Sequence, residues 1–227
     1  MASEGGVALG TSEGYALAAE ALARQVMLGD VKKLKKTSKA ARELAKKALE
    51  LDPNNQEAQL QHAITDGFVA RLSGDVSAWM KKLPQKSLSL IQSYRETYPN
   101  DARGDALLGA WHLGVARKAG DKNAMKWFKA SVEDGQTYYE MALEKHSDDP
   151  IILVNYALAL MALGESDYSD WTRSKDLLSA AITLPGEDDL SRKVLHKASK
   201  ILSAIDDKET ARRYAEAFLD GESLDKT

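Results

Sequence analysis

The stretch that decides the fold reads ARELAKKALELDPNN and covers residues 41–55. Its apolar side chains recur at helical spacing, which places them on one face of a helix. These positions are Ala41, Leu44, Ala45, Ala48 and Leu49. Pro53 ends the helix, because proline has no backbone N–H and disfavours helical geometry in the residue before it. The stretch therefore predicts an amphipathic helix whose buried face is rich in small residues.

A tripeptide with a central glycine recurs on both sides of this stretch. The four copies are Leu28-Gly29-Asp30, Ser73-Gly74-Asp75, Ala119-Gly120-Asp121 and Leu163-Gly164-Glu165. Their glycines are 45, 46 and 44 residues apart, and they alternate with Pro53, Pro99, Pro150 and Pro185. A glycine just past a helix supplies the left-handed backbone that stops it, and a proline stops the next helix. Each period therefore predicts a helical hairpin, and the chain predicts an all-α repeat protein.

These signals, with the apolar periodicity, predict ten helices. They span residues 13–28, 38–52, 56–73, 84–98, 101–119, 123–145, 150–163, 171–184, 190–205 and 209–219. Ser38 is predicted to cap the second helix, and Gly135 to kink or divide the sixth. Paired in order, the helices form an α-solenoid of about four to five antiparallel hairpins. We expect a flexible N-terminal segment at 1–12, a single domain over 13–220 and a C-terminal tail at 221–227.

The segment 41–55 resembles the second helix of a tetratricopeptide repeat (TPR). In that family, small residues at the positions of Ala41 and Ala48 let the two helices of a hairpin approach closely. Residues 88–100 and 174–185 resemble the same helix more weakly. The chain departs from the family in having longer leading helices and insertions between the helices of each hairpin. The resemblance implies a TPR-like solenoid whose leading helices line a concave groove, and this groove binds a segment of another protein.

The resemblance also implies candidate partner-binding residues on the leading helices. Gln61, Thr65 and Phe68 lie at i, i+4 and i+7 and therefore share one helix face. Carried through offsets of 46 and then 44 residues, this face gives equivalents in the next two hairpins. The full candidate set is Gln61, Thr65, Phe68, Arg103, Leu107, Trp111 and Asn155. Thr65, Trp111 and Asn155 then form a row along the groove.

Two features of the leading helices have alternative interpretations. Asn155 is a single amide within the apolar run 151–163, and a buried amide needs hydrogen-bond partners. It either binds the main chain of a guest or bonds to a neighbouring helix. Similarly, Gly104, Gly109 and Gly114 either allow close helix packing or leave a hollow for a guest.

The sequence gives no support for catalysis, a metal site or a cofactor. It has no cysteine, and none of its four histidines has a histidine partner at i+3 or i+4. No phosphate-binding loop, nucleophile elbow or dinucleotide fingerprint occurs. We therefore predict a protein that is not an enzyme and that binds no metal and no cofactor.

The 31 basic and 34 acidic residues give a net charge of −3, which points to no particular partner. One local excess of positive charge runs from Lys32 to Lys47 and contains no aromatic residue for base stacking. We interpret it as a solvated helix face and expect no nucleic-acid partner. Trp79, Trp127 and Trp171 follow three of the glycines, and we expect them to anchor the inter-helix connections on the core. The alternative is a row of aromatic contacts for a partner.

The run 151–163 is the longest apolar stretch, and its 13 residues are fewer than the roughly 20 that cross a bilayer. The first residues lack the basic and apolar regions of a signal peptide. We therefore expect a protein that does not span a membrane and that is cytoplasmic, or periplasmic if a signal peptide has been removed.

Together these observations predict a non-enzymatic module that binds another protein or peptide. One alternative is a small-molecule binder or a transport-associated accessory protein. The latter resembles the TPR-like component that works with substrate-binding proteins of bacterial tripartite transporters. Another alternative is self-assembly through the end hairpins. The sequence leaves the oligomeric state open.

Overall fold

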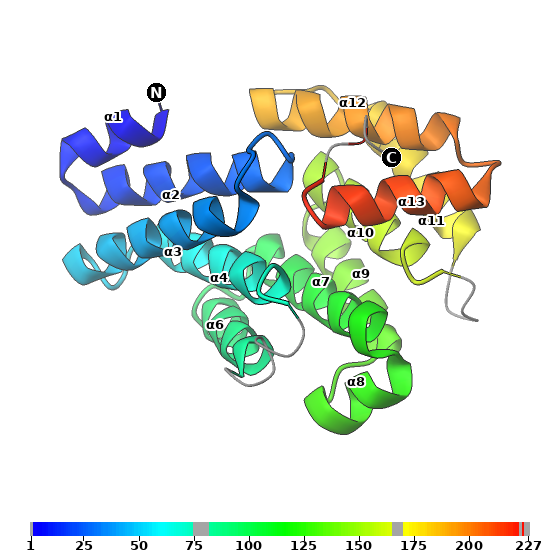
Figure 1. Cartoon of the computed structure of the whole chain (residues 1–227), viewed down its shortest axis with the longest axis horizontal. Helices are drawn as coiled ribbons and strands as arrows, with labels where there is room; N and C mark the ends of the chain where they lie inside the picture. Colours follow the sequence, from blue (N-terminus) through cyan, green and yellow to red (C-terminus); the bar gives the residue numbers. More distant parts are fainter. Residues whose placement is uncertain (1, 75–81, 165–169, 223, 225–227) are drawn as a thin grey trace. The chain divides into compact units, whose positions relative to one another are not determined.

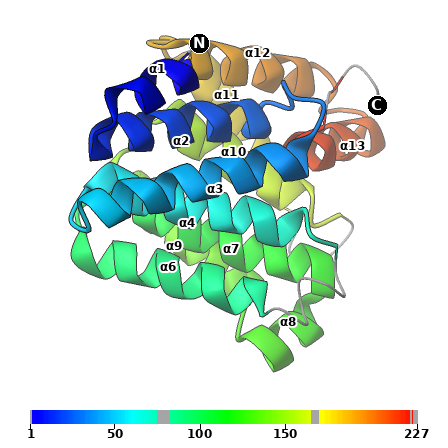
Figure 2. The same ribbon diagram turned by 60° about the vertical axis from the view of Figure 1, so that its left-hand side comes forward.

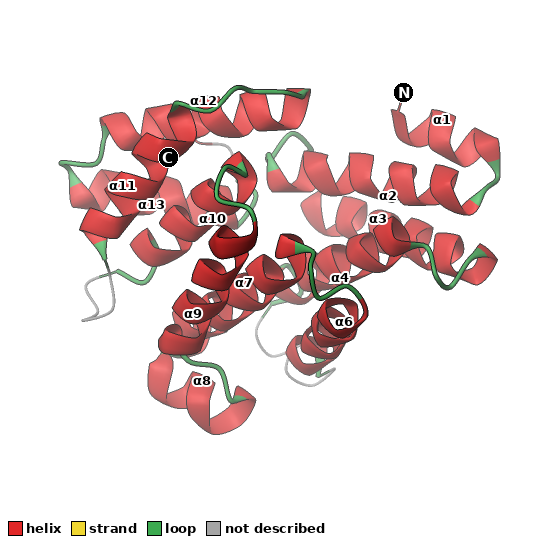
Figure 3. Ribbon diagram, turned by 180° about the vertical axis from the view of Figure 1, so that it is seen from behind, coloured by secondary structure: helices red, strands yellow, loops and turns green. Residues whose placement is uncertain are grey.

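The computed structural model describes residues 2–74, 82–164, 170–222 and 224, and the regular elements in these ranges are all helices (Figures 1 and 3). The all-α prediction is confirmed. The chain divides into two compact units, residues 1–98 and 99–227, and the single domain over 13–220 stays a prediction. In a chain of helix pairs each pair packs mainly on its neighbours, so the packing can separate into groups that a repeat pattern does not reveal.

Unit 1 is built from helices that pack on one another in chain order (Figure 2). They are α1 (Ala2–Leu9), α2 (Ser12–Met27), α3 (Leu34–Leu51), α4 (Gln56–Arg71) and α6 (Leu83–Thr97). Helix α2 packs on α3, α3 on α4, and α4 on α6, and the two leading helices α2 and α4 also pack on each other. The pairs α2/α3 and α4/α6 correspond to the first two predicted hairpins.

The small-residue face of α3 is buried as predicted. Ala41, Ala45 and Ala48 are fully buried. Ala48 meets Ala16 of α2 and Ala58 of α4 in one apolar cluster. Because side-chain size at the contact sets the distance between helix axes, these alanines allow α2, α3 and α4 to pack closely.

Residues 2–9 form α1, whereas the sequence analysis predicted a flexible segment over 1–12. Helix α1 packs on α2, and the two cross at Gly6 and Gly14. A Cβ atom on either glycine would collide with the carbonyl oxygen of the other. This close backbone approach requires glycine. The helix was not predicted because the segment lacks the apolar periodicity that indicates one.

Helix α3 begins at Leu34, before the predicted cap residue Ser38. The Ser38 hydroxyl donates a hydrogen bond to the carbonyl oxygen of Leu34 at 2.9 Å, within the helix. A serine hydroxyl can either cap a helix or bond to the carbonyl four residues earlier. The residue type alone therefore does not locate the start of α3.

Unit 2 surrounds the apolar helix α10 with other helices. They are α7 (Ala102–Ala119), α8 (Asp121–Phe128), α9 (Val132–Lys145), α10 (Pro150–Met161), α11 (Trp171–Ile182), α12 (Asp189–Ser203) and α13 (Lys208–Leu219). Helix α10 packs on α7, α9, α11, α12 and α13, and nine of its twelve residues are buried. The pairs α7/α9, α10/α11 and α12/α13 correspond to the remaining predicted hairpins.

The predicted helix over 123–145 is divided, but not at Gly135. Helix α8 ends before Lys129, which adopts the left-handed conformation with φ of 57°. Ser131 then caps α9, because its hydroxyl oxygen accepts a hydrogen bond from the N–H of Asp134 at 3.0 Å. Gly135 lies inside α9, where a Cβ would collide with the side chain of Leu113. This glycine serves close helix packing instead of a break.

The tryptophans do not behave as one class. Trp127 is 54% exposed, so the prediction that it anchors a connection on the core is wrong. Trp171 is half-buried at the start of α11. Trp79 lies outside the described residues.

Candidate partner-binding surface

The predicted contact residues lie on three leading helices in two units. Gln61, Thr65 and Phe68 are on α4 in unit 1. Unit 2 holds Arg103, Leu107 and Trp111 on α7, and Asn155 on α10. Helices α7 and α10 pack directly on each other. The candidates therefore form two groups, one in each unit.

On α4, Gln61 and Thr65 are directed into the protein. Thr65 is fully buried, and its hydroxyl donates to the carbonyl oxygen of Gln61 at 2.6 Å. Gln61 is 4% exposed, and its Nε2 donates to Glu57 at 2.8 Å. Thr65 therefore has no surface to offer a partner in this conformation.

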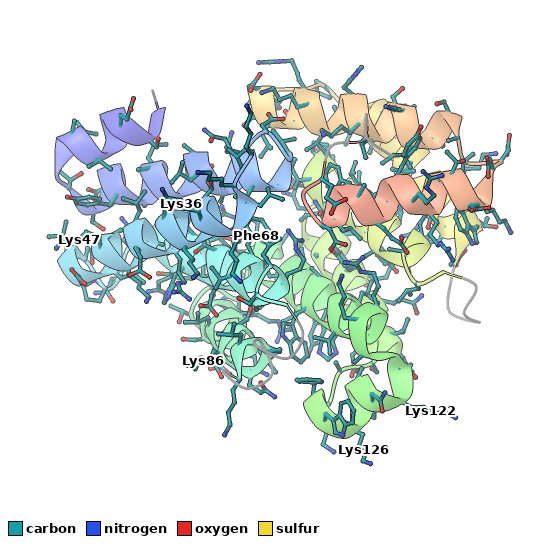
Figure 4. All side chains as sticks on the ribbon, viewed as in Figure 1. Lys36, Lys47, Phe68, Lys86, Lys122 and Lys126 are labelled. Atoms are coloured by element: carbon teal, nitrogen blue, oxygen red, sulfur yellow. The ribbon has the colours of Figure 1, made fainter. Side chains whose placement is uncertain are left out.

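Phe68 is the accessible member of the α4 group. It is half-buried, and the guanidinium of Arg71 lies 4.9 Å from its ring centroid (Figure 4). A cation over an aromatic face restrains both side chains. Of the three candidates on α4, only Phe68 is thus accessible, with Arg71 beside it.

On α7, Arg103 and Leu107 are accessible whereas Trp111 is not. The Arg103 side chain is 43% exposed and is held by Asp101, which accepts from its Nη2 at 2.8 Å. Leu107 is half-buried. Trp111 is only 8% exposed, and its ring lies edge-on to His112 at a centroid distance of 5.1 Å. The indole therefore contributes mainly to the packing of unit 2.

The glycines of α7 have two different roles. A Cβ on Gly109 would lie 2.5 Å from Cδ2 of Tyr139, so this glycine allows α7 and α9 to pack closely. A Cβ on Gly114 would meet no atom within 4 Å. Ala110, between them, is exposed. Close packing and open space, the two alternatives for these glycines, thus occur on the same helix.

These observations define an outward face of α7. We call it the α7 strip, and it consists of Arg103, Leu107, Ala110 and Gly114. Steps of four, three and four residues keep the four positions on one helix face. Of these four residues, the set of contacts predicted from the sequence contains only Arg103 and Leu107. Beyond Leu107 the side chains of the strip are small. At its N-terminal end lies the Arg103 guanidinium, which is paired with Asp101.

Asn155 uses part of its amide within α10. Its Nδ2 donates to the carbonyl oxygen of Ile151 at 2.8 Å, and the residue is half-buried. This bond uses one N–H of the amide within α10 and leaves Oδ1 available as an acceptor. Asn155 therefore bonds within its own helix instead of to a neighbouring one, and its contact with a guest stays a prediction.

His112 is a structural histidine. It is 7% exposed, and its Nδ1 accepts a hydrogen bond from the N–H of Ser131 at 3.2 Å. Burial lowers its pKa below the ordinary value of 6.5, and the charge of Asp134 only partly opposes this. The neutral ring links α7 to the start of α9. In the described ranges, no group of three or more His, Asp or Glu side chains is arranged to hold a metal ion.

Comparison with protein-family models, curated proteins and solved structures found no match to this chain. Within the described part of the chain, no helix has the length and apolar character needed to cross a membrane.

Proposed function

We propose that this is a TPR-like helical repeat protein, without enzymatic activity, that binds a segment of another protein. The proposal is supported by the succession of helix pairs and by the packing of leading helix on leading helix within each unit, α2 on α4 and α7 on α10. Alanines at the helix contacts in unit 1 add to this support. Helical repeats of this kind present extended faces to other molecules.

The observation that carries the proposal is the α7 strip. Ala110 is exposed and nothing lies within 4 Å of the Cβ position of Gly114, so a guest chain can approach the α7 backbone there. Leu107 offers apolar area beside this open region. The guanidinium of Arg103 is already oriented by Asp101, so less side-chain freedom is lost when it pairs with a carboxylate. The strip therefore suits a peptide with one apolar side chain and one acidic group.

Asn155 is a further polar contact in this proposal. It lies on α10, which packs on α7, and its Oδ1 is available to accept a hydrogen bond from a guest N–H. Thr65 and Trp111 are omitted from the proposed contacts because both are buried. The proposed surface is thus the α7 strip together with Asn155, all within unit 2.

The test is a matched pair of substitutions in unit 2. Ala110 on α7 and Ala180 on α11 are both exposed alanines in helices, so Ala110→Glu and Ala180→Glu add the same charge and bulk to the same kind of site. Each variant and the wild-type protein would be immobilised and used to capture proteins from the native host extract. We expect one protein to be retained by wild type and Ala180→Glu, and its retention by Ala110→Glu to fall about tenfold or more, because the added carboxylate lies within the interface. Equal retention by all three, or no specific retention by wild type, contradicts the proposal.

A further inference from the structure

Helix α8 is an insertion that projects from the end of α7 (Figures 1 and 3). It packs on α7. Ala124 is fully buried and Phe128, one turn later, is half-buried. These two residues attach α8 to unit 2 and leave its opposite face free.

The free face of α8 combines lysines with large apolar side chains. Lys122 and Lys126 lie at i and i+4, and both extend outward from the helix (Figure 4). On the helical wheel Met125 lies on one side of this pair, and Asn123 followed by Trp127 lies on the other. Met125 and Trp127 are 45% and 54% exposed. Lys129 adds a third exposed lysine at the C-terminal end of α8.

The folding of α8 does not account for this face. Lys126 and Lys129 complement the negative end of the helix dipole, but Lys122 lies in the first turn, where a positive charge is unfavourable. The side chains of these three lysines make no ion pair or hydrogen bond with any residue that the structure describes. An exposed indole also forgoes the burial that stabilises tryptophan elsewhere in the unit, as at Trp111.

We propose that α8 docks the protein on the surface of a lipid bilayer that carries anionic headgroups. The three lysines meet the negative headgroup charge, and Trp127 and Met125 enter the headgroup region beside them. Tryptophan is suited to this position because its ring is apolar while its N–H can donate to headgroup oxygens. A projecting helix offers no groove for an acidic peptide, whereas a deformable bilayer surface complements it. This binding is independent of the α7 strip.

The experiment uses the full chain with two kinds of vesicle, one of phosphatidylcholine alone and one of phosphatidylcholine with phosphatidylserine. We expect co-flotation with the anionic vesicles only, and weaker binding as salt rises, since salt screens exposed charges. The Lys122→Gln/Lys126→Gln variant should lose about tenfold or more in partitioning, because each lysine near an anionic surface contributes roughly fivefold. Both substitutions keep good helix formers on the surface, and circular dichroism confirms the fold.

The matched control is Lys35→Gln/Lys36→Gln in α3. The side chains of these exposed lysines also have no ion-pair partner among the described residues, and their replacement changes the net charge by the same amount. We expect this variant to bind anionic vesicles nearly as wild type does. Equal losses in the two variants would show general attraction of lysines to the vesicles and would overturn the proposal.

Trp127 provides a second readout. On anionic vesicles, tryptophan emission of the wild type should shift to shorter wavelength, and Trp127→Phe should abolish most of that shift. If the wild type floats with the vesicles and Trp127→Phe keeps the same emission shift, the insertion of the Trp127 side chain is overturned. Binding to soluble polyglutamate but not to anionic vesicles would assign α8 to an acidic protein and would likewise overturn the proposal.

Discussion

Helix α4 of unit 1 and helix α7 of unit 2 each bury a carboxylate, and they neutralise it in different ways. Asp105 on α7 is fully buried and pairs with Nζ of Lys145, which also donates to the carbonyl oxygen of Pro99 at 2.6 Å. Asp66 on α4 is 7% exposed, and Nη1 of Arg42 lies 3.4 Å from its Oδ1. Its Oδ2 has no hydrogen-bond partner among the described residues. Unit 2 thus depends on a tight ion pair where unit 1 tolerates a loose one.

The largest expected effect comes from removing the cation of each pair. Lys145→Ala should lower the free energy of unfolding by about 3 kcal/mol, the lower end of the range for breaking a buried ion pair, because Lys145 is partly exposed. Arg42→Ala should cost only about 1 kcal/mol, since its contact with Asp66 is long and the exposed Glu43 shares the guanidinium. Urea denaturation of both variants measures the difference.

A double substitution distinguishes charge from packing in the tight pair. Asp105→Asn/Lys145→Met removes both charges with little change in size and should recover most of the stability that Lys145→Ala loses. Equal losses for Lys145→Ala and Arg42→Ala would contradict the distinction between the two carboxylates. A double variant as unstable as Lys145→Ala would mean that the lysine acts through its hydrogen bond to Pro99.

The same two helices show how far the fold could be predicted. The helix pairs were predictable because glycine, proline and apolar periodicity act over a few residues, and these signals bound α4 and α7 within one or two residues. The pairing of Asp105 with Lys145 was not, because it joins residues 40 apart in sequence. The break at Lys129 was missed for a related reason, since a lysine in the left-handed conformation carries no sequence signal.

The candidate site was predicted less well than the fold. Helical periodicity places Gln61 and Thr65 on one face, but it does not say what packs on that face, and here both are buried. Trp111 was selected because it lies 46 residues after Thr65 on the equivalent helix face, but the size of an indole favours burial as much as contact. The open position at Gly114 and the exposed Ala110 required coordinates, because a small residue is equally consistent with close packing and with a bare surface.

Glycine to alanine substitutions sharpen the comparison of α4 with α7. Gly109→Ala should lower stability by about 1–2 kcal/mol, because overpacking outweighs the gain in helix propensity. The new Cβ would lie 2.5 Å from Cδ2 of Tyr139, whose ring is stacked on Tyr156 at a centroid distance of 4.6 Å and cannot easily move. Gly67→Ala should raise stability by about 0.5–1 kcal/mol, since the nearest atom is Oγ of Ser87 at 3.4 Å.

Gly114→Ala is the internal control on α7. It adds a methyl group where no atom lies within 4 Å, so it should behave as Gly67→Ala does and raise the urea midpoint. If Gly109→Ala also raised the midpoint, α7 and α9 would not be packed as closely as the structure shows. If Gly114→Ala lowered it, the open character of the α7 strip would be in error.

The smallest expected effect is the pH dependence contributed by one histidine on each helix. Burial lowers the pKa of His62 on α4 and of His112 on α7 below 6.5, although Asp66 and Asp134 respectively oppose the shift. A histidine with a lowered folded-state pKa is protonated first in the unfolded chain. Its contribution to stability is therefore fully present above pH 6.5. That contribution is lost as the pH falls below 6.5 toward the folded-state pKa.

Protonation should harm α7 more than α4. The Nδ1 of His112 accepts the N–H of Ser131 at 3.2 Å, and a protonated ring can only donate there, so the link to the start of α9 is lost. Urea midpoints between about pH 7 and pH 5 should fall less in His112→Asn than in wild type, because the asparagine carbonyl keeps the acceptor and does not titrate. His62→Asn should change the slope less, since the His62 ring accepts no hydrogen bond from any residue that the structure describes. A wild-type slope that His112→Asn leaves unchanged would assign the acid sensitivity to other groups, and the two helices would then not differ in their histidines.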